Sequence, residues 1–549
     1  MRASVVVPFI LLSALVIGPA SAQTVGDCEP GTAEATLAVN DVRAILFNGG
    51  NLFYGNGTFR GYHVPKRTGN WPIFDTQFWA GGLVDGELRT AGATYDRFEF
   101  WPGPLDADGN PPEDCAQYDR IYVTSRGDVQ RYYETGEATD DLRDWPVDLG
   151  APVLDGDGVA GNYNLAGGDE PAISGDQTAW WVMNDAGNVH QRSQTPPLGL
   201  EARVEAFAVG SPVEALNQAT LYRYRLYYRG AAPIDSVYVA LWAEHDIGDA
   251  GDDCLGTDTT LHMGYGYNCA ESDALYGIPP AVGVKMVQGP VGLRNDRDDD
   301  GDGETDEAGE RLGMTASSCY SRLSFSDPSD AEGMYRCMRG IWADGTPITA
   351  FGDGYGDEGP VTTHIWPGDP VTGAFWSAEN IDGSGSQAIP ADYRFMVASG
   401  PFRMEPGDTE EVVFAIPFAQ GADRLDSVVK LRAAARYLQR AYDLGLFEPE
   451  RVRPAPTEPE PPTTFVLRAF PNPFATSAAV ELTVADGAGA LRLAVYDVLG
   501  REVALLADGV LAPGDYPFTL DGAELPAGVY FVRLETGRQT EALTLVHVE

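Results

Sequence analysis

The most regular group of potential ligand atoms is an acidic run at residues 295–307, which reads NDRDDDGDGETDE. It matches the calcium-loop pattern D-x-[DN]-x-[DN]-G-x5-E, in which alternate short carboxylates surround a tight glycine turn. Ca²⁺ prefers about six to eight hard oxygen ligands, and this spacing supplies them. The predicted ligands are Asp296, Asp298, Asp300, the carbonyl of Asp302 and Glu307, and an overlapping register that begins at Asp298 adds Asp306. The sequence therefore predicts a calcium site here, with a solvated acidic loop as the alternative.

A second acidic cluster follows a predicted strand, in the sequence HDIGDAGDDCLGTDTT (245–260). The carboxyl groups that could share one cation are those of Asp246, Asp249, Asp252, Asp253 and Asp258. Their spacing is irregular, so a polar turn is the favoured interpretation and a second calcium site is the alternative. The shorter acidic runs at 106–108 and 155–158 are expected to be turns.

The residues that most enzymes use for catalysis form no recognisable motif in this sequence. The six histidines are scattered without an HExxH pair, no serine lies in a GxSxG sequence, and no glycine-rich phosphate loop precedes a helix. A glycosidase needs two carboxyl groups at a suitable separation, but the 81 acidic residues give no basis for selecting a pair. We therefore predict no catalytic residue, and a binding or structural role is favoured over catalysis.

The six cysteines all lie before residue 338. An even number of cysteines in an exported chain favours disulfides. Proximity in the sequence predicts the pairs Cys254–Cys269 and Cys319–Cys337, which leaves Cys28 with Cys115, although other pairings remain open. No two cysteines have the CxxC spacing that is typical of zinc, iron–sulfur or haem attachment.

Composition and the N-terminus restrict the compartment and the partners. Arg2, the apolar run at 5–17 and the small residues at 20–22 predict a signal peptide of residues 1–22 and export to the periplasm. No later stretch has the roughly 18 apolar residues that a membrane helix needs. The net charge of −44 disfavours nucleic acids and anionic membranes as partners.

A mainly β fold must position these residues. Alternating apolar and polar side chains predict strands at 201–209, 219–230, 236–245 and 409–421. One convincing amphipathic helix follows Asp423, which can cap it. The apolar residues spaced for one face of this helix are Leu425, Val428, Val429, Leu431, Leu438 and Leu444.

The domain organisation is marked by a proline-rich stretch at 449–463, which we interpret as an extended linker. All tryptophans and cysteines precede it. We predict a large β-rich, multi-sheet or sandwich body at 23–448, which a seam near 195–199 would divide into two lobes. After the linker, short strands separated by turn residues predict a small Ig-like β-sandwich at 464–549.

Three ordered motifs occur in this last region. They are Pro471-Asn472-Pro473-Phe474, the segment from Tyr496-Asp497 through Gly500 to Val503, and Gly528-Val529-Tyr530-Phe531. They resemble the type A C-terminal sorting domain of proteins that Bacteroidetes-like bacteria export through the type IX secretion system. The resemblance implies recognition by the type IX machinery, with a secreted or cell-surface product. Such tails usually carry a lysine near the start of the last strand, where this chain has Thr544.

The body contains phrases such as FWAGGLVDGEL and MEPGDTEEVVFAI, which resemble a functionally uncharacterised family of exported proteins with the same tail. From the sequence we expect a secreted or surface-anchored protein, stabilised by calcium and disulfides, with a binding or structural role. An extracellular glycan or another surface component is its expected partner. The alternative is an extracellular hydrolase that acts on a polysaccharide or another polymer.

Overall fold

The computed structural model describes residues 25–548 except for a set of short segments, and the chain separates into two compact units, Met1–Val452 and Arg453–Glu549. The segments that are not described are 56–57, 60, 93, 96–97, 293–308, 322–326, 357–358, 453–464, 485–489, 499 and 537–539. We call the first unit the body and the second the tail, and describe each by itself. In the described part of the chain, no helix is long and apolar enough to cross a membrane.

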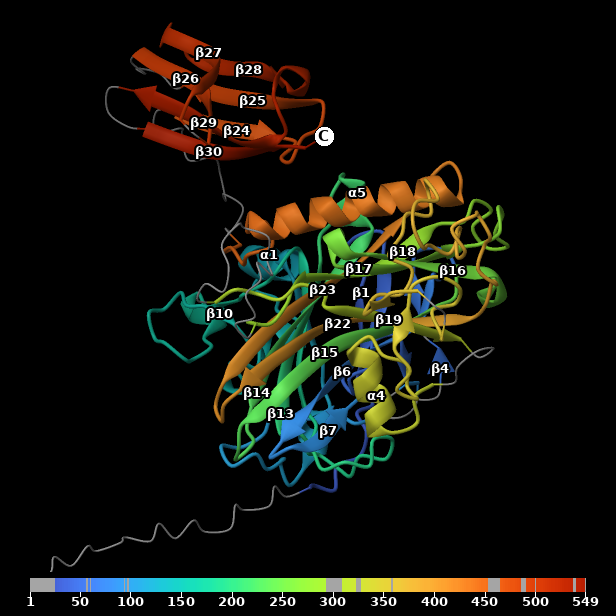
Figure 1. The fold of residues 1–549 in the computed structure, drawn as a ribbon. Coiled ribbons are helices and arrows are strands. Elements are labelled where there is room, and N and C mark those ends of the chain that lie inside the picture. The colour runs from blue at the N-terminus through green and yellow to red at the C-terminus, as the bar shows by residue number, and fades with distance from the viewer. Residues whose placement is uncertain are drawn as a thin grey trace, which may run out of the picture. The chain divides into compact units, whose positions relative to one another are not determined.

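The body contains two large antiparallel sheets (Figure 1). The first has the strand order β1-β2-β5-β6-β15-β22-β19, with β7 also paired to β6. Its strands are β1 (Glu34–Leu37), β2 (Arg43–Phe47), β5 (Tyr62–His63), β6 (Ile73–Val84), β7 (Glu87–Ala91), β15 (Ile234–His245), β19 (Ala316–Ser321) and β22 (Tyr393–Met404).

The second sheet has the order β16-β17-β18-β23-β14-β13-β12-β8, with β9 also paired to β12. Its strands are β8 (Trp101–Pro102), β9 (Tyr122–Ser125), β12 (Gln177–Asn184), β13 (Leu200–Ala208), β14 (Ala219–Tyr228), β16 (Asp253–Asp258), β17 (Met263–Asn268), β18 (Ala281–Gln288) and β23 (Thr409–Ala419). Three two-stranded pairs lie outside the two sheets: β3 (Tyr54–Gly55) with β4 (Thr58–Phe59), β10 (Val153–Leu154) with β11 (Glu170–Pro171), and β20 (Ile348–Thr349) with β21 (Val361–Thr362).

The two sheets face each other across one continuous apolar core. Side chains alternate between the faces of a strand, so an alternating pattern buries every second residue. On β14 this places Tyr222, Tyr224 and Tyr228 in the core, and the ring of Tyr224 stacks on Phe78 of β6 with 4.4 Å between ring centroids. The prediction of a mainly β, multi-sheet body is confirmed, and the four strands predicted from alternation correspond to β13, β14, β15 and β23.

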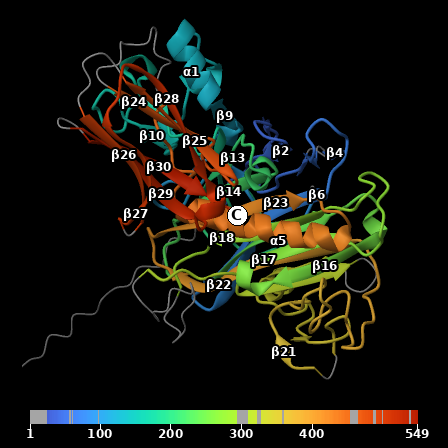
Figure 2. The same ribbon diagram turned by 90° about the horizontal axis from the view of Figure 1, so that it is seen from above.

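Helices lie on the outer faces of the sheets. Helix α5 (Arg424–Asp443) begins at Asp423, whose side chain accepts hydrogen bonds from the backbone N–H groups of residues 425 and 426, as predicted. It packs on β23, β18 and β17, and Figure 2 shows it lying across this part of the second sheet. Val429 and Leu444 are 45% and 40% exposed, which corrects their predicted place on the apolar face. Val429 is one residue off the buried stripe through Val428 and Leu431, and Leu444 follows the last turn.

The other helices of the body are α1 (Arg126–Thr135), α2 (Asp140–Arg143), α3 (Glu214–Asn217) and α4 (Ala331–Met338). Helix α4 packs on β7, β15, β19 and β22 of the first sheet.

Two of the three predicted disulfides are present, Cys28–Cys115 and Cys254–Cys269. The prediction of a Cys319–Cys337 bridge is wrong in this structure, because both residues are buried free thiols. The Ser318 hydroxyl donates to the Cys337 carbonyl, so the side chain of residue 318 points toward α4. Cys319 is the next residue on β19 and therefore points to the opposite face. It pairs in register with Phe395, whose ring lies against Gly264 of the second sheet.

The tail is a small two-sheet domain with its own apolar core. One sheet has the order β24-β25-β28 and the other β27-β26-β29-β30. The strands are β24 (Phe465–Phe470), β25 (Ser477–Val484), β26 (Ala490–Asp497), β27 (Glu502–Val510), β28 (Gly514–Asp521), β29 (Gly528–Thr536) and β30 (Thr540–His547). This arrangement agrees with the small β-sandwich expected from the sequence.

Candidate functional sites: an acidic cluster and a basic pocket

Three carboxyl groups from two separate segments, those of Glu244, Asp246 and Asp392, converge in the body, and Asp253 of a third segment lies near enough to feel the charges of Asp246 and Asp392; we call the four residues the acidic cluster. One carboxylate oxygen from each of Glu244, Asp246 and Asp392 lies within 4.8 Å of the others. The backbone carbonyl of Asp253 accepts a hydrogen bond of 3.3 Å from the N–H of residue 391, which brings the fourth member beside them.

Strand pairing explains this convergence. β15 and β22 are antiparallel neighbours, and Glu244 is paired in register with Arg394. The end of β15 therefore lies beside the beginning of β22, which places Asp246 and Asp392 together. Asp253 is the first residue of β16 in the other sheet, and a disulfide joins the next residue, Cys254, to Cys269, which directly follows β17. The acidic cluster thus spans both sheets.

The electrostatics of the cluster are dominated by burial. Asp253 is fully buried, and among the described residues its carboxylate oxygens have no hydrogen bond of good geometry, only a weak interaction with the Ile247 N–H. Burial, followed by the charges of Asp246 and Asp252, raises the pKa of Asp253 well above its usual value, against a weaker opposing effect of the Ile247 N–H. Burial also raises the pKa of Glu244 to about 9.

Arg394 supplies positive charge to part of this cluster. Its guanidinium is 1% exposed and forms ion pairs with Glu244 and, at 2.8 Å, with Asp392. The Tyr95 hydroxyl bridges the same pair, because it donates to Glu244 and accepts from Arg394. One guanidinium against four carboxyl groups leaves a surplus of negative charge if all four ionise. Several converging carboxylate oxygens are the ligand set that a hard divalent cation such as Ca²⁺ prefers.

The structure separates the five aspartates predicted in the second acidic segment. Asp246 and Asp253 belong to the acidic cluster. Asp252 lies next to it and accepts a hydrogen bond of 2.8 Å from Asn268. Asp249 caps a short 3-10 helix at 250–252, and Asp258, at the far end of β16, forms an ion pair of 3.1 Å with Arg432.

Sequence reasoning missed Glu244 and Asp392. Glu244 lies in a strand that was predicted, but Asp392 is almost 150 residues away, and only the β15–β22 pairing brings the two together. The predicted calcium loop, with Asp296, Asp298, Asp300, Asp302, Asp306 and Glu307, lies outside the described residues.

A second group of carboxylates, Asp155, Asp157 and Asp169, also meets within 4.8 Å. Here the oxygens have protein donors. Asp169 accepts from the backbone N–H groups of residues 156, 157 and 164, and Asp157 accepts from Asn162 and Asn164. Asp106 likewise accepts from the N–H groups of residues 108 and 110. Both runs have the hydrogen bonding of polar turns.

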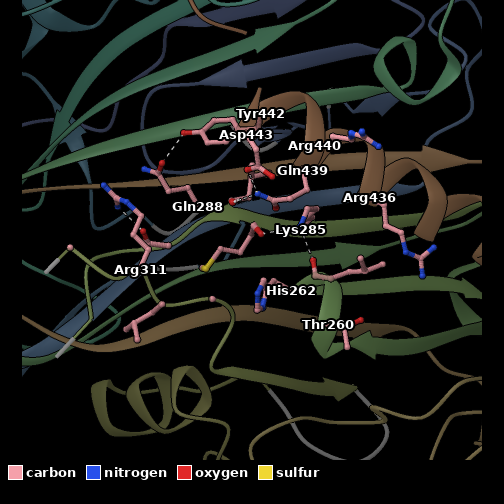
Figure 3. A pocket seen from close by; sticks show the side chains of 17 residues that line it. Thr260, His262, Lys285, Gln288, Arg311, Arg436, Gln439, Arg440, Tyr442 and Asp443 are labelled. Atoms are coloured by element: carbon pink, nitrogen blue, oxygen red, sulfur yellow. Dashed lines mark hydrogen bonds between the residues drawn. The ribbon is translucent and has the colours of Figure 1, made fainter. Parts of the chain in front are cut away.

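A cavity of about 770 Å³ lies between α5, β18 and the segment 309–313 (Figure 3). We call it the basic pocket. Its lining residues are Thr260, Leu261, His262, Lys285, Met286, Val287, Gln288, Gly289, Gly309, Arg311, Leu312, Gly313, Arg436, Gln439, Arg440, Tyr442 and Asp443. Four of these side chains are basic, and Asp443 is the one carboxylate among them.

Among the described residues, the cations of the basic pocket form no ion pair with a carboxylate. Lys285 is 1% exposed, and its ammonium group donates to the backbone carbonyls of Leu261 and Met286 at 2.8 and 3.3 Å. Burial lowers the pKa of Lys285 to about 8, although Asp443 and Asp258 oppose this shift. Arg311 donates to the carbonyls of residues 289 and 411.

His262 adds no positive charge to the pocket. Its Nδ1 accepts a hydrogen bond of 3.1 Å from the backbone N–H of Met314, and an acceptor nitrogen carries no proton. Burial lowers the pKa of His262 to about 4, so the ring is neutral near pH 7.

In the tail, the three sequence motifs fix the ends of strands. The Asn472 side chain donates to the carbonyl of Thr544 at 2.9 Å and accepts from the N–H of Val546 at 2.8 Å. Phe474 is 1% exposed and exchanges backbone hydrogen bonds with residues 546 and 548. The Pro471–Phe474 motif therefore attaches the end of β24 to the last strand.

The other two motifs form turns. Asp497 accepts from the backbone N–H and the guanidinium of Arg501, and Gly500 between them has φ 75°, a conformation that favours glycine. Gly528 opens β29, where the Tyr530 hydroxyl donates to the Pro526 carbonyl at 2.6 Å.

Comparison with known proteins identifies the tail. Residues 468–547 match the model of the secretion system C-terminal sorting domain. No curated protein matches the chain. Among solved structures, a polysaccharide lyase matches with 8% identity over 63% of this chain and 34% of its own, at a TM-score of 0.18. The chain thus spans about a third of that protein, and so weak a likeness shows neither a shared fold nor a shared activity. The type IX sorting tail indicates that the protein is exported to the cell surface or secreted.

Proposed function

We propose that the body is a calcium-stabilised protein with a binding or structural role outside the cell. The observation that carries this proposal is the convergence of Glu244, Asp246 and Asp392 near Asp253, a fully buried carboxyl group whose oxygens, among the described residues, have no hydrogen bond of good geometry. The sorting tail supplies the location. We also propose that residues 1–22 are a signal peptide, which provides the first step of export.

A cation accounts for the acidic cluster better than protons alone. Moving a charged carboxylate out of water costs several kcal/mol unless it is paired. The cluster can avoid this cost by taking up protons or by binding a divalent ion. Outside the cell at neutral pH, an ion held by Glu244, Asp246 and Asp392, with Asp253 nearby, would have the oxygen ligands that calcium prefers. Such an ion would join β15 and β22 of the first sheet to β16 of the second, so it would stabilise one end of the two-sheet body.

The sequence motif at 296–307 is proposed as a second calcium site, because its spacing matches the calcium-loop pattern. The two sites are independent in the sequence, so each can be removed separately. Variants at Asp296, Asp298 and Asp300 test the loop, and a variant at Asp253 tests the acidic cluster.

The experiment is a calcium titration by calorimetry of the mature full-length protein after treatment with a chelator. We expect the wild type to bind calcium at two sites, and Asp253→Asn to lose one of them. The triple variant Asp296→Asn, Asp298→Asn, Asp300→Asn should lose the other. Asp249→Asn is the matched control, because Asp249 is an exposed cap outside the cluster. Unchanged calcium binding by Asp253→Asn would refute the assignment of the acidic cluster.

The buried state of the cluster also bears on the alternative of an extracellular hydrolase. A glycosidase needs carboxyl groups that face a bound sugar across an open cleft. Glu244 is 4% exposed and Asp253 is fully buried, so these groups are suited to holding an ion within the fold. The cavity between α5, β18 and the segment 309–313 has four cationic side chains and one carboxylate, Asp443, in its described lining, so it lacks the carboxylate pair of a glycosidase. Binding is therefore the role that the geometry supports.

A further inference from the structure

We propose that the basic pocket binds a small anionic ligand whose charge is a carboxylate, sulfate or phosphate group. This inference deepens the proposed binding role, because it names the chemical class that the body would recognise. It depends on the basic pocket alone and not on the acidic cluster.

The first argument is the excess of positive charge in an acidic protein. The whole chain has 81 acidic and 37 basic residues, yet the described residues that line the pocket include four basic side chains and one carboxylate. A lining with this charge attracts anions and raises their local concentration. The rest of the acidic surface would repel a large polyanion, so a small ligand that enters the cavity is favoured.

The second argument comes from a comparison of arginines on the same helix. On α5, Arg424 forms ion pairs with Glu271 and Glu379, and Arg432 forms ion pairs with Asp258 and Asp369. Within the described part of the chain, the next two arginines of the helix, at positions 436 and 440, form no such pair although both line the pocket. They are separated by one helical turn and therefore lie on the same side of α5 (Figure 3).

The third argument is the ammonium group of Lys285. An ammonium group has three N–H donors, and two of those of Lys285 are directed to the carbonyls of residues 261 and 286. Among the described residues the third donor has no acceptor, and Lys285 lines the pocket, so this donor is available to a ligand. Burying a cation that is bound only to neutral carbonyls is costly, and an anion in contact with it would reduce this cost. A bound anion would also oppose the lowering of the Lys285 pKa to about 8 that burial causes.

The size and the remaining polar groups indicate what the anion is attached to. A volume of about 770 Å³ is in the range of pockets for small ligands. Gln288, Gln439, Tyr442 and Thr260 place amide and hydroxyl groups around the cations, and protein hydrogen bonds hold the first three in place: the Tyr442 hydroxyl donates to Gln288, and the Gln439 amide donates to the carbonyl of residue 287. Arginine binds carboxylate, sulfate and phosphate oxygens through paired N–H donors. The pocket therefore fits a ligand with an anionic group on a polar, hydroxyl-bearing body, such as one or two units of an acidic sugar.

The test measures binding to the calcium-saturated full-length protein by calorimetry. The probes are a uronic acid disaccharide, a sulfated disaccharide, inorganic phosphate and a neutral disaccharide. We expect at least one anionic probe to bind and the neutral disaccharide not to bind. The anionic probe that binds most tightly identifies the source of the charge. Absence of binding by all three anionic probes at millimolar concentration, or equal binding of the neutral disaccharide, would overturn the proposal.

The decisive variant is the double substitution Arg436→Gln, Arg440→Gln, which keeps most of each side chain and removes both charges. We expect its affinity for the anionic probe to fall by about tenfold or more for each guanidinium that contacts the ligand. Arg67→Gln, Arg131→Gln is the control, because both residues are exposed, lie outside the pocket and give the same change of net charge. Equal affinity of the two double variants would overturn the proposal. The calcium titration of Asp253→Asn does not involve the pocket, so failure of one proposal is distinguishable from failure of the other.

Discussion

Replacing Asp253 by asparagine should change how the calcium-free protein responds to pH. Burial, reinforced by Asp246 and Asp252, raises the pKa of Asp253 well above its usual value. The folded protein therefore keeps this proton at pH values where the unfolded chain has lost it. The stabilisation is fully present below the unfolded pKa of about 4, and it is lost as the pH rises toward the folded pKa. Asparagine has a similar shape and no titrating group, so the variant should lack this loss.

The magnitude follows from the proton linkage of one group. For each pH unit between about 4 and the raised pKa of Asp253, the free energy of unfolding of the calcium-free wild type should fall by up to about 1.4 kcal/mol relative to Asp253→Asn. Glu244, whose pKa burial raises to about 9, should produce a similar fall that is present in both proteins. The difference between the two proteins therefore isolates Asp253. Calcium should remove most of the difference in slope, because carboxylates that hold the ion are deprotonated across this range.

The assay is urea unfolding followed by tryptophan fluorescence, from about pH 5 to about pH 8, with chelator or with calcium. All ten tryptophans lie before the linker, so the signal reports on the body and not on the tail. Asp249→Asn is again the control, and its curve should run parallel to the wild type. Parallel curves of the wild type and Asp253→Asn in chelator would refute the reasoning, because they would show that the Asp253 carboxyl group has no raised pKa.

Three other predictions follow from the structure. The thiols of Cys319 and Cys337 should resist alkylation in the native protein, because both are buried and burial raises the pKa of Cys337 to about 12. In denaturant without a reductant, two thiols per chain should react with the alkylating reagent. If no thiol reacted, the chain would contain a third disulfide. Phe474→Ala should destabilise the tail by about 3–5 kcal/mol, because Phe474 is buried beside His547. Phe470→Ala should destabilise it much less, because Phe470 is 49% exposed. Thermal unfolding of the full chain followed by circular dichroism compares the stability of the two variants. Deletion of residues 465–549 should leave the body in the periplasm, which cell fractionation measures. Thr544→Lys, at an exposed position of β30, should preserve export. Export of the truncated protein would contradict the role of the sorting domain.

Local patterns were sufficient to predict several elements of the fold. The Asp423 cap and the apolar repeat placed α5, and alternation placed β13, β14, β15 and β23, because these signals depend on neighbouring residues. The Cys254–Cys269 disulfide was predictable for a related reason, since a tight hairpin of β16 and β17 joins the two cysteines. Short sequence separation alone wrongly predicted a disulfide between Cys319 and Cys337. Cys319 points to the face of β19 that is opposite α4, which carries Cys337.

The candidate sites depend on pairings between distant parts of the chain. Asp246 and Asp253 were among the predicted ligands, but Asp392 meets Asp246 only through the pairing of β15 with β22. The basic pocket had no sequence signal, because Lys285 and Arg436 are about 150 residues apart and meet where α5 packs on β18. The partners of a surface arginine cannot be read from a sequence with twice as many acidic as basic residues.

Because acidic residues outnumber basic ones in this chain, a buried carboxyl group and a guanidinium without an acidic partner each require a specific explanation. In a chain with 81 acidic residues, most carboxylates can stay in water at little cost, so a carboxyl group that is fully buried, such as Asp253, requires a specific reason. A guanidinium in the same chain is surrounded by potential acidic partners, and Arg424 and Arg432 each contact two of them. The lack of such a pair at Arg436 and Arg440, within the described residues, is therefore more informative here than it would be in a neutral protein. A protein of this composition has to hold acidic side chains away from a site for an anion, and Asp443 is the one carboxylate among the described residues that line the basic pocket.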